Sequence, residues 1–499
     1  MSKAKKHDFY DKMLIAFMLL AAAAMLGVSH FHEMASYNET DFYGSYACDA
    51  QNILQGKEYT EPDHGPGYVL VLAITSLLFQ DMFLTGKAVS IFSSLLIILF
   101  TFKLVDVLFN KKVAFYTVVL LFLILLPFSI LVKSDIFFAA VVIISIYFFY
   151  SKTPLSYSNL FWSGLVAGYA FITRYNAIFL PISVALILIF LNPDNDAWNR
   201  RMKGLLVYSL AFFLVSVPWW IFNYFHAGGP MSQSNYLVVA MTFYGSGTSF
   251  GAEEKVLAAA KFNSLFSVIS FDFEYFAFQL IKHIVKYFQN ALTHLVKFPL
   301  YLFFAPGLIL LLFNNTKKIF SLLVFPVLGF LILTLVQFWP RFYLYIAPFF
   351  IFVPVYFIFR EDIFKQARYS YMVFSLCAIF LLYYSVLETK KNVTSEPTEL
   401  IEIAQVLRHN RTDSDVLIAR KPHLGFLSNI NTEYFPEVDS LEALLKFAKE
   451  RNATYLLYSD VEEELRPKLR ILQQPARLPE NLQLIYKRER SKIFLYKIN

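Results

Sequence analysis

The sequence predicts an all-α polytopic membrane bundle of about eleven transmembrane helices, with amphipathic helices on its outer face and a small C-terminal α/β domain outside the membrane. The chain of 499 residues is 57% hydrophobic and only 16% charged, a balance outside the range of soluble domains. Its 55 Phe and 31 Tyr suit lipid-facing surfaces and interfacial belts. Eleven apolar runs are long enough to cross about 30 Å of hydrocarbon.

These apolar runs are 13–30, 84–108, 113–132, 136–150, 159–173, 176–192, 204–223, 297–313, 318–338, 343–359 and 370–386. A further stretch, 68–79, is too short to span, so we expect an interfacial or re-entrant helix there. The first run follows a lysine-rich start, which is typical of a retained signal anchor or, alternatively, of a cleaved signal peptide. The two cysteines, Cys48 and Cys377, do not suggest a disulfide framework.

Basic residues fix the expected orientation of the bundle. They cluster in alternate gaps between the runs, at positions 3–12, 111–112, 152, 200–203, 317–318 and 360–368. The positive-inside rule then places the N-terminus in the cytoplasm and the C-terminus outside an inner (plasma) membrane. The net charge of +7 is therefore a topology signal, and no nucleic-acid partner is expected.

This orientation leaves three large segments outside, at 31–82, 225–297 and 388–499. We therefore expect a transmembrane domain over 1–387 and a soluble domain over 388–499. The segment 225–297 starts rich in Gly and Ser and continues with helical spacing, so it could form a substrate gate or simply pack on the bundle. In the last segment, patterning predicts helices at 398–409 and 440–451, the latter capped by Ser440. It also predicts strands at 415–419, 454–459, 482–486 and 492–496.

The segment from Asn38 to Gly56, directly after the first run, carries the first candidate for chemistry. Thr40 is a suitable helix N-cap and Gly56 a suitable stop. Asp41 would then lie in the first helical turn, where the helix dipole favours the carboxylate anion. The residue could serve as a base or a metal ligand, or it could only cap the helix. Glu39 lies two residues earlier.

Charged residues at the expected outer ends of other runs are the remaining candidates. Asp135 follows the third run, Arg174 stands at a tight hairpin tip, and Arg341 follows a Trp-Pro pair. Both arginines break the positive-inside rule, and such charges usually have a partner. Guanidinium groups donate two parallel hydrogen bonds to phosphate oxygens. His64 could assist them, while solvation of Asp135 and snorkelling of the arginines are the simpler alternatives.

Taken in order, these residues resemble a known family pattern. The chain is similar to the C-type superfamily of polyprenyl-phosphate-dependent glycosyltransferases, particularly its protein O-mannosyltransferase and aminoarabinose-transferase branch. The similarity rests on Asp41 with Tyr46 and Gly56, His64-Gly-Pro-Gly67, Ser134-Asp135, Gly164 through Arg174, Pro218-Trp219 with Asn223, Arg341 through Pro348, and Asp415 through Pro422.

The resemblance implies roles for these positions. Asp41 would be the catalytic acid, with Glu39 and Asp135 as further acids. The donor's lipid phosphate would lie by His64, Arg174, Arg341 and Tyr345. The chain departs from the family pattern in two places. Asp41 is followed by Phe42 where many relatives have Glu, and a proline of the turn after His64 is replaced by glycine. A divalent metal, Mg or Mn, with Asp41 as a ligand is left open.

The resemblance therefore implies an inverting transfer of one sugar from a polyprenyl-phosphate donor to an acceptor outside the membrane. The expected partners are that donor, membrane lipids, and a glycan, lipid or protein acceptor. A transporter or flippase of lipid-linked saccharide is the main alternative; it would have ionisable residues near the midplane and paired interrupted helices. A non-catalytic assembly component is the third possibility. The sequence does not distinguish the sugar or the acceptor.

Overall fold

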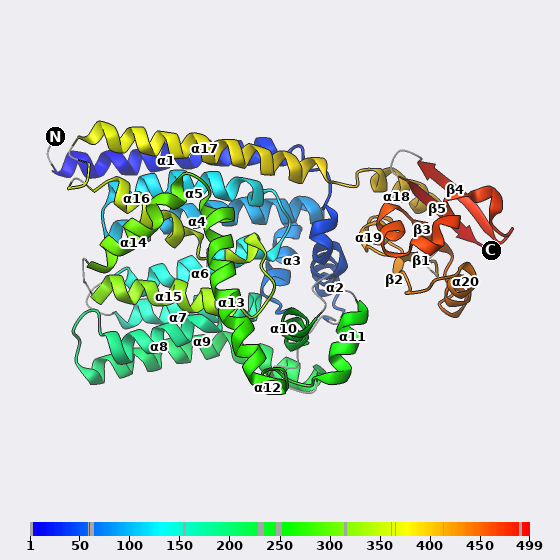
Figure 1. Ribbon diagram of the computed structural model, residues 1–499, viewed down its shortest axis with the longest axis horizontal. Coiled ribbons are helices and arrows are strands. Elements are labelled where there is room, and N and C mark those ends of the chain that lie inside the picture. The colour runs from blue at the N-terminus through cyan, green and yellow to red at the C-terminus, as the bar shows by residue number, and fades with distance from the viewer. Residues whose placement is uncertain are drawn as a thin grey trace. The chain divides into compact units, whose positions relative to one another are not determined.

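The chain forms two compact units in the computed structural model (Figure 1). The model describes residues 3–57, 59, 64–152, 156–227, 234–245, 252–313, 317–360, 362–364, 366–412, 414–488 and 492–499. The first unit, here the helical unit, comprises Met1–Phe31 and Glu58–Lys391. The second, the sheet unit, comprises His32–Lys57 and Asn392–Asn499. The residues just after the first helix therefore group with the C-terminal region, while the predicted domain boundary at 387/388 stays a prediction.

Every one of the eleven apolar runs falls on a helix. They lie on α1 (Lys3–Ser29), α4 (Met82–Leu108), α5 (Lys111–Ser129), α6 (Ser134–Tyr150), α7 (Tyr157–Thr173), η3–α8–η4 (Tyr175–Leu191), α9 (Trp198–Ala227), η6–α14 (Leu300–Phe313), α15 (Lys317–Leu333), α16 (Ala347–Ile358) and α17 (Ala367–Thr394). The short stretch predicted as helix is α3, at Gly67–Phe79.

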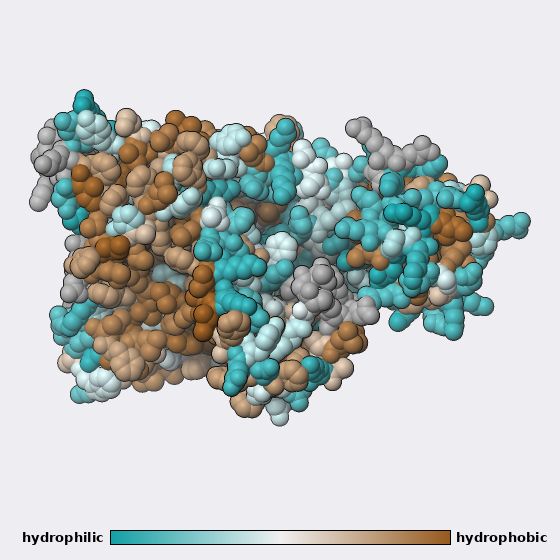
Figure 2. All heavy atoms as spheres, in the orientation of Figure 1, coloured by the Kyte–Doolittle hydropathy of each residue, from teal (hydrophilic) through white to brown (hydrophobic). Residues whose placement is uncertain are grey.

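Five helices among the described residues are long and apolar enough to cross a membrane. They are Phe9–Ser29, Met82–Leu108, Lys111–Ser129, Trp198–His226 and Ala367–His409. The other apolar helices have 10–17 residues. Hydrophobic side chains cover much of the helical unit on the face shown in Figure 2. The structure thus supports a multi-helix membrane protein, and the number of spans remains a prediction.

Close packing fixes the helices that carry the candidate site. Gly164 of α7 lies so near α9 that an added Cβ would stand 2.3 Å from the Tyr208 carbonyl oxygen. Small residues allow this approach where no hydrophobic effect drives helices together in lipid. The Ser145 hydroxyl of α6 donates to the Ser163 carbonyl of α7 at 3.0 Å. These contacts hold α6, α7 and α9 in a defined register.

The segment after α9 forms four further helices, α10 (Asn235–Tyr244), α11 (Ala252–Lys261), α12 (Leu265–Phe271) and α13 (Phe273–Ala291). Helix α13 runs across the direction of the other bundle helices (Figure 1). It exposes Phe278, Ile281 and Val285, in keeping with the predicted amphipathic helix. The glycine-rich stretches proposed as a gate, 226–230 and 244–251, lie largely outside the described residues.

The sheet unit is built on five strands in the order β2-β1-β3-β5-β4. Strands β1 (Val416–Ala419), β2 (Asn431–Tyr434) and β3 (Tyr455–Tyr458) pair in parallel; β5 (Ile493–Ile498) joins β3 and β4 (Leu482–Arg488) antiparallel. The four predicted strands and both predicted helices, now α18 (Glu399–Asn410) and α20 (Leu441–Glu450), are confirmed. Ser440 caps α20 by accepting from the Ala443 amide at 3.2 Å. Strand β2, α19 (His423–Ser428) and α21 (Asp460–Leu465) were not predicted.

The N-terminal part of the sheet unit is one continuous helical segment. It runs through η1 (Tyr37–Glu39) and η2 (Phe42–Tyr46) into α2 (Ala47–Leu54). The prediction of Thr40 as N-cap is wrong, because Ser36 caps the segment four residues earlier in a capping box with Glu39. The predicted stop at Gly56 is confirmed, since its φ of 68° is a conformation that favours glycine.

Candidate active site

The N-terminus of α6 places a buried carboxylate at the centre of a cluster of charges in the helical unit. Asp135 lies in the first turn of α6, and its side chain is 7% exposed. One carboxylate oxygen accepts a hydrogen bond from Arg174. The other lies 3.7 Å from Nε of Arg341. Three of the predicted site residues, far apart in sequence, therefore meet here.

Local structure aims both guanidinium groups at this carboxylate. Arg174 ends α7 in an extended conformation, and its amide donates to the Ala170 carbonyl at 2.9 Å. Arg341 belongs to the short helix η7 (Pro340–Tyr343). Both guanidinium groups rest on the Phe342 ring, at 4.9 Å and 5.2 Å from its centroid, which is favourable cation–π geometry. Two cations and one anion leave the cluster with net positive charge.

The turn that carries His64 packs on the end of α7, and the last residues of this helix directly precede Arg174. A Cβ added at Gly65 would stand 1.9 Å from the Ile172 carbonyl oxygen, and one at Gly67 would stand 2.3 Å from Oγ1 of Thr173. Glycine at these two positions therefore permits a close backbone approach. The half-buried His64 is thereby positioned by the same helix end as Arg174.

Tyr345 lies in the core of the helical unit. Its side chain is 1% exposed, and its hydroxyl donates to the Gly329 carbonyl of α15 at 2.7 Å. The ring stacks on Phe179 at 5.2 Å and meets the edge of Phe138 at 5.3 Å. In this structure the residue joins α6, α8 and α15, and its predicted contact with a lipid phosphate stays a prediction.

An aromatic cluster that the sequence did not reveal lies beside these residues. The Tyr59 hydroxyl donates to the His64 carbonyl at 2.8 Å, and its ring meets Trp219 edge-on at 5.5 Å. The Trp219 indole donates to the hydroxyl of Tyr175, the residue after Arg174, at 2.9 Å. Only the Pro218-Trp219 pair within the family resemblance pointed to this cluster. Flat aromatic faces of this kind suit the apolar face of a sugar ring.

An apolar groove of about 330 Å³ opens between α8, α13 and α15. Its lining includes Phe179 and Ile182 of α8, Leu280 of α13, and Leu331 of α15. Phe179 also stacks on Tyr345, which lies two residues after the end of η7, the helix that carries Arg341. Its walls offer a long hydrocarbon chain an apolar surface and almost no polar partners.

The sheet unit presents Asp41 on an exposed helical turn and encloses Glu39. Glu39 is 1% exposed. One of its oxygens accepts from the amide and hydroxyl of Ser36 at 2.8 Å and 2.9 Å. The other lies 3.6 Å from Nε2 of His32. Of the two neighbouring acids, Asp41 is the accessible one.

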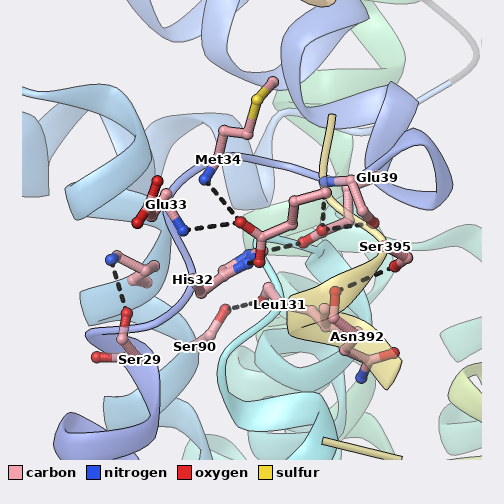
Figure 3. A network of polar contacts seen from close by, with 12 residues as sticks. Ser29, His32, Glu33, Met34, Glu39, Ser90, Leu131, Asn392 and Ser395 are labelled. Carbon is pink, nitrogen blue, oxygen red and sulfur yellow. Dashed lines mark hydrogen bonds and ion pairs between the residues drawn. The ribbon is translucent and has the colours of Figure 1, made fainter. Parts of the chain in front are cut away.

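His32 joins this segment to the residues that follow the last long helix. Its Nδ1 lies 2.5 Å from a Glu396 oxygen, whose second oxygen accepts from the amides of Glu33 and Met34 at 2.9 Å and 3.3 Å (Figure 3). Burial alone would lower the pKa of His32, but hydrogen bonds and charges of Glu39 and Glu396 raise it to about 9. The protonated imidazole thus lies between two buried carboxylates.

The described residues of the candidate site do not fit a divalent metal ion. Within the parts of the chain that the structure describes, no three or more His, Cys, Asp and Glu side chains are grouped to hold a metal ion. The Asp135 carboxylate already has two arginine partners, and Glu39 is engaged by Ser36 and His32. Asp41 alone would offer a divalent ion too few oxygen ligands. No step of a mechanism is therefore assigned to a metal.

Comparisons with known proteins are consistent with this geometry. Residues 63–222, less than half of the chain, match a family model described as dolichyl-phosphate-mannose-protein mannosyltransferase. A comparison with curated protein sequences gave no match.

Solved structures give the similarity of the fold. One is the oligosaccharyltransferase AglB from Archaeoglobus fulgidus in complex with an inhibitory peptide and a dolichol-phosphate, with 12% identity and a TM-score of 0.61 over 98% of this chain and 75% of that chain. Another is ArnT from Cupriavidus metallidurans bound to undecaprenyl phosphate, with 12% identity and a TM-score of 0.61 over 97% of this chain and 98% of that chain. At such identities the likeness concerns the fold.

Proposed function

From the fold that this chain shares with C-type, polyprenyl-phosphate-dependent glycosyltransferases, we propose that it transfers a sugar from a polyprenyl-phosphate donor to an acceptor outside an inner (plasma) membrane. The observation that carries the proposal is the pair of arginines, Arg174 and Arg341, that converge on Asp135. The net positive cluster has the fork geometry that suits phosphate oxygens. The dolichol-phosphate and undecaprenyl phosphate in the two similar structures support the donor class.

The proposed reaction inverts the anomeric centre. The acceptor hydroxyl oxygen attacks the anomeric carbon while the bond from this carbon to the phosphate oxygen breaks. Asp41 takes the hydroxyl proton. The lipid phosphate leaves with the bonding electrons, and Arg174 and Arg341 stabilise the negative charge that develops on it.

Each remaining acid then has a structural task. We assign the base to Asp41 rather than Glu39, because both Glu39 oxygens already interact with Ser36 and His32. Asp135 holds the two guanidinium groups near one another until the donor phosphate binds. His64 contributes a further polar group beside Arg174, on the turn fixed by α7.

The donor's polyprenyl chain is assigned to the groove between α8, α13 and α15. Each buried methylene contributes roughly 0.8 kcal/mol, so even part of a long chain anchors the donor firmly. The proposal includes eleven spans. The helices Ser134–Tyr150 and Tyr175–Leu191 each have 17 residues, about 26 Å of helix, which is close to the hydrocarbon thickness.

Sugar transfer in reconstituted membranes tests the proposal. Radiolabelled polyprenyl-phosphate sugars would be given to the wild type, to Asp41→Asn and to the matched control Asp439→Asn, whose exposed carboxylate pairs with Lys468. We expect transfer by the wild type and the control, and a loss of about 10²- to 10⁴-fold in Asp41→Asn with donor binding retained.

Two other outcomes would count against the proposal. Wild-type transfer by Asp41→Asn removes Asp41 from the reaction. Movement of the labelled donor across vesicles, with no transfer to any acceptor, identifies the protein as a flippase instead.

A further inference from the structure

The end of strand β1 brings a lysine of the C-terminal region onto the segment that presents Asp41. Nζ of Lys421 donates to Oγ1 of Thr40 at 2.9 Å and to the Tyr37 carbonyl at 3.4 Å. Thr40 is the residue directly before Asp41. The ammonium group is thus held by the Tyr37 carbonyl and the Thr40 side chain, close to the proposed base. Lys421 and Asp41 belong to the same compact unit.

The backbone that carries Lys421 is fixed on its other side. The carboxylate of Glu462, 2% exposed, accepts from the amide of Arg420 at 3.0 Å. The same group accepts from the amide and the hydroxyl of Ser459, at 2.8 Å and 2.5 Å. A buried acid with all these partners holds the turn after β1 rigidly.

Two contacts beyond Lys421 press the same turn onto the helical segment. The Pro422 ring would lie 3.2 Å from a Cβ added at Gly44. The imidazole of His423, which is fully buried, lies 3.1 Å from the Ser36 carbonyl oxygen. These contacts hold the backbone next to Lys421 against the helical segment, from Ser36 to Gly44.

The side chain of Lys421 is partly shielded from water. Burial lowers the pKa of this half-buried lysine, the neighbouring Arg420 lowers it further, and the carboxylates of Asp41 and Glu462 raise it. Two of its three N–H groups have protein partners. The Asp41 carboxylate is thus one of the charges that act on Lys421.

We propose that Lys421 is a positioning residue for the transfer reaction: anchored on Thr40 and Tyr37, its ammonium group orients the turn that presents Asp41 and places a positive charge beside the carboxylate. The inference rests on the proposed function, in which Asp41 is the base. It gives the C-terminal region a part in the reaction, although that region contains no catalytic motif of its own. A purely structural role, in which Lys421 only ties two segments together, makes different predictions.

Charge deletion and chemical restoration distinguish the two roles in the full-length protein. We expect Lys421→Met to lower kcat by about 10- to 100-fold, because a small misplacement of a catalytic group has effects of this size. The KM for the donor should change little, and Lys421→Arg should retain most activity. The matched control is Lys446→Met, whose side chain is 80% exposed in the same unit and whose loss should leave kcat unchanged.

Alkylation of Lys421→Cys supplies the sharpest readout. Treatment with bromoethylamine adds an aminoethyl group and restores a cation of nearly the same length, whereas iodoacetamide adds a neutral group of similar size. We expect recovery of kcat only with bromoethylamine. Mass spectrometry would confirm complete labelling, and the wild type would be treated in parallel because Cys48 and Cys377 are free thiols.

Each result has a definite meaning. A kcat of Lys421→Met equal to that of the wild type overturns the inference. So does fully labelled Lys421→Cys whose kcat is restored by both reagents, or by neither of them. If Asp41→Asn remains fully active, the base assignment in the proposed function fails, whatever Lys421 does. If Asp41→Asn is inactive while Lys421→Met is fully active, only the present inference fails.

Discussion

At the scale of single residues, Asp135 shows how one carboxylate can bring together two arginines that are far apart in sequence. It is nearly buried and holds Arg174 and Arg341 on either side. Without it, two guanidinium groups that share the Phe342 ring would repel one another. In the proposed function, this carboxylate holds both arginines where a donor phosphate could accept hydrogen bonds from them.

We therefore expect Asp135→Asn to weaken donor binding and lower the thermal stability together. Loss of one partner from a buried ion pair costs about 3 kcal/mol at most here, since both arginines are roughly one quarter exposed to solvent. Binding of undecaprenyl phosphate and the melting temperature in detergent are the measurements. If donor affinity and stability are unchanged while transfer is lost, Asp135 acts directly in the chemistry.

Two buried histidines should give the sheet unit an optimum of stability in pH. The pKa of His32 is raised to about 9. Protonated His32 therefore stabilises the folded state fully below the usual histidine pKa near 6.5, and this stabilisation is lost as the pH rises through about 9. Burial lowers the pKa of His423 to about 4, more than its bond to the Ser36 carbonyl raises it. Neutral His423 therefore stabilises the folded state fully above pH 6.5, and this stabilisation is lost as the pH falls toward 4.

Maximal protection of residues 32–46 is therefore expected near pH 6.5. Hydrogen exchange of this segment, corrected for the intrinsic rate, measures its opening free energy between pH 4 and 10. His32→Gln should remove the decline on the alkaline side and leave the acid side intact. A flat profile in the wild type would contradict both assignments.

The sequence revealed those site residues that stand out in their local sequence context. Asp135, Arg174 and Arg341 stood out because charges at helix ends are unusual beside apolar runs, and Ser440 because caps have a local signature. The capping box of Ser36 and Glu39 has such a local signature and was missed, whereas the contact of His32 with Glu396, 364 residues away, could not be foreseen. For the same reason no pattern pointed to Lys421.

At the scale of elements, the turn after His64 relies on two glycines for its contact with α7. We expect Gly65→Ala to reduce stability by about 1–3 kcal/mol, the usual cost of overpacking, because the new methyl group would overlap the Ile172 carbonyl. Donor affinity should fall as well, since the end of α7 presents Arg174. Thermal unfolding and donor titration would measure both effects.

The control for this substitution is Gly27→Ala. Gly27 lies inside α1 and has no atom within 4 Å of an added Cβ. Alanine there should be neutral or slightly stabilising, because glycine is the poorer helix former by about 1 kcal/mol. Equal losses in the two variants would show that the contact with α7 is unimportant.

The apolar groove between α8, α13 and α15 can be tested as an element by filling it. We expect Leu331→Trp to raise the KM for a long-chain polyprenyl donor about tenfold, equivalent to roughly 1.4 kcal/mol of lost binding. A donor with a short prenyl chain should be unaffected, because it does not reach the groove. Leu210→Trp, on the exposed face of α9, is the control. Equal effects on both donors would exclude the groove as the lipid site.

Helical spacing predicted the helices well, since all eleven apolar runs are helical, but it could not determine how each one crosses the membrane. Several helices fall short of 18 residues, and η segments extend some of them. Length alone therefore supports five spans. Strand β2 escaped prediction because its four residues, Asn431–Tyr434, lack an apolar alternation.

At the scale of the whole molecule, the division into units is not collinear with the chain. Residues His32–Lys57 belong with the C-terminal region, held by the His32–Glu396 contact and by the turn after β1. A chain that ends at Lys391 should therefore lose protection specifically at 32–57. Limited proteolysis with mass spectrometry should show cleavage there while 84–391 stays resistant. Unchanged resistance of 32–57 would show that this segment is stable without the C-terminal region.

The contact between His32 and Glu396 also sets an order of events during biosynthesis. The ribosome makes His32 first and must add 364 further residues before its partner exists. At usual elongation rates this takes about 20–70 s. Through that interval the Asp41 turn has neither its histidine clamp nor its lysine. A nascent chain therefore cannot complete the contacts of the Asp41 turn until Glu396 and Lys421 have been made.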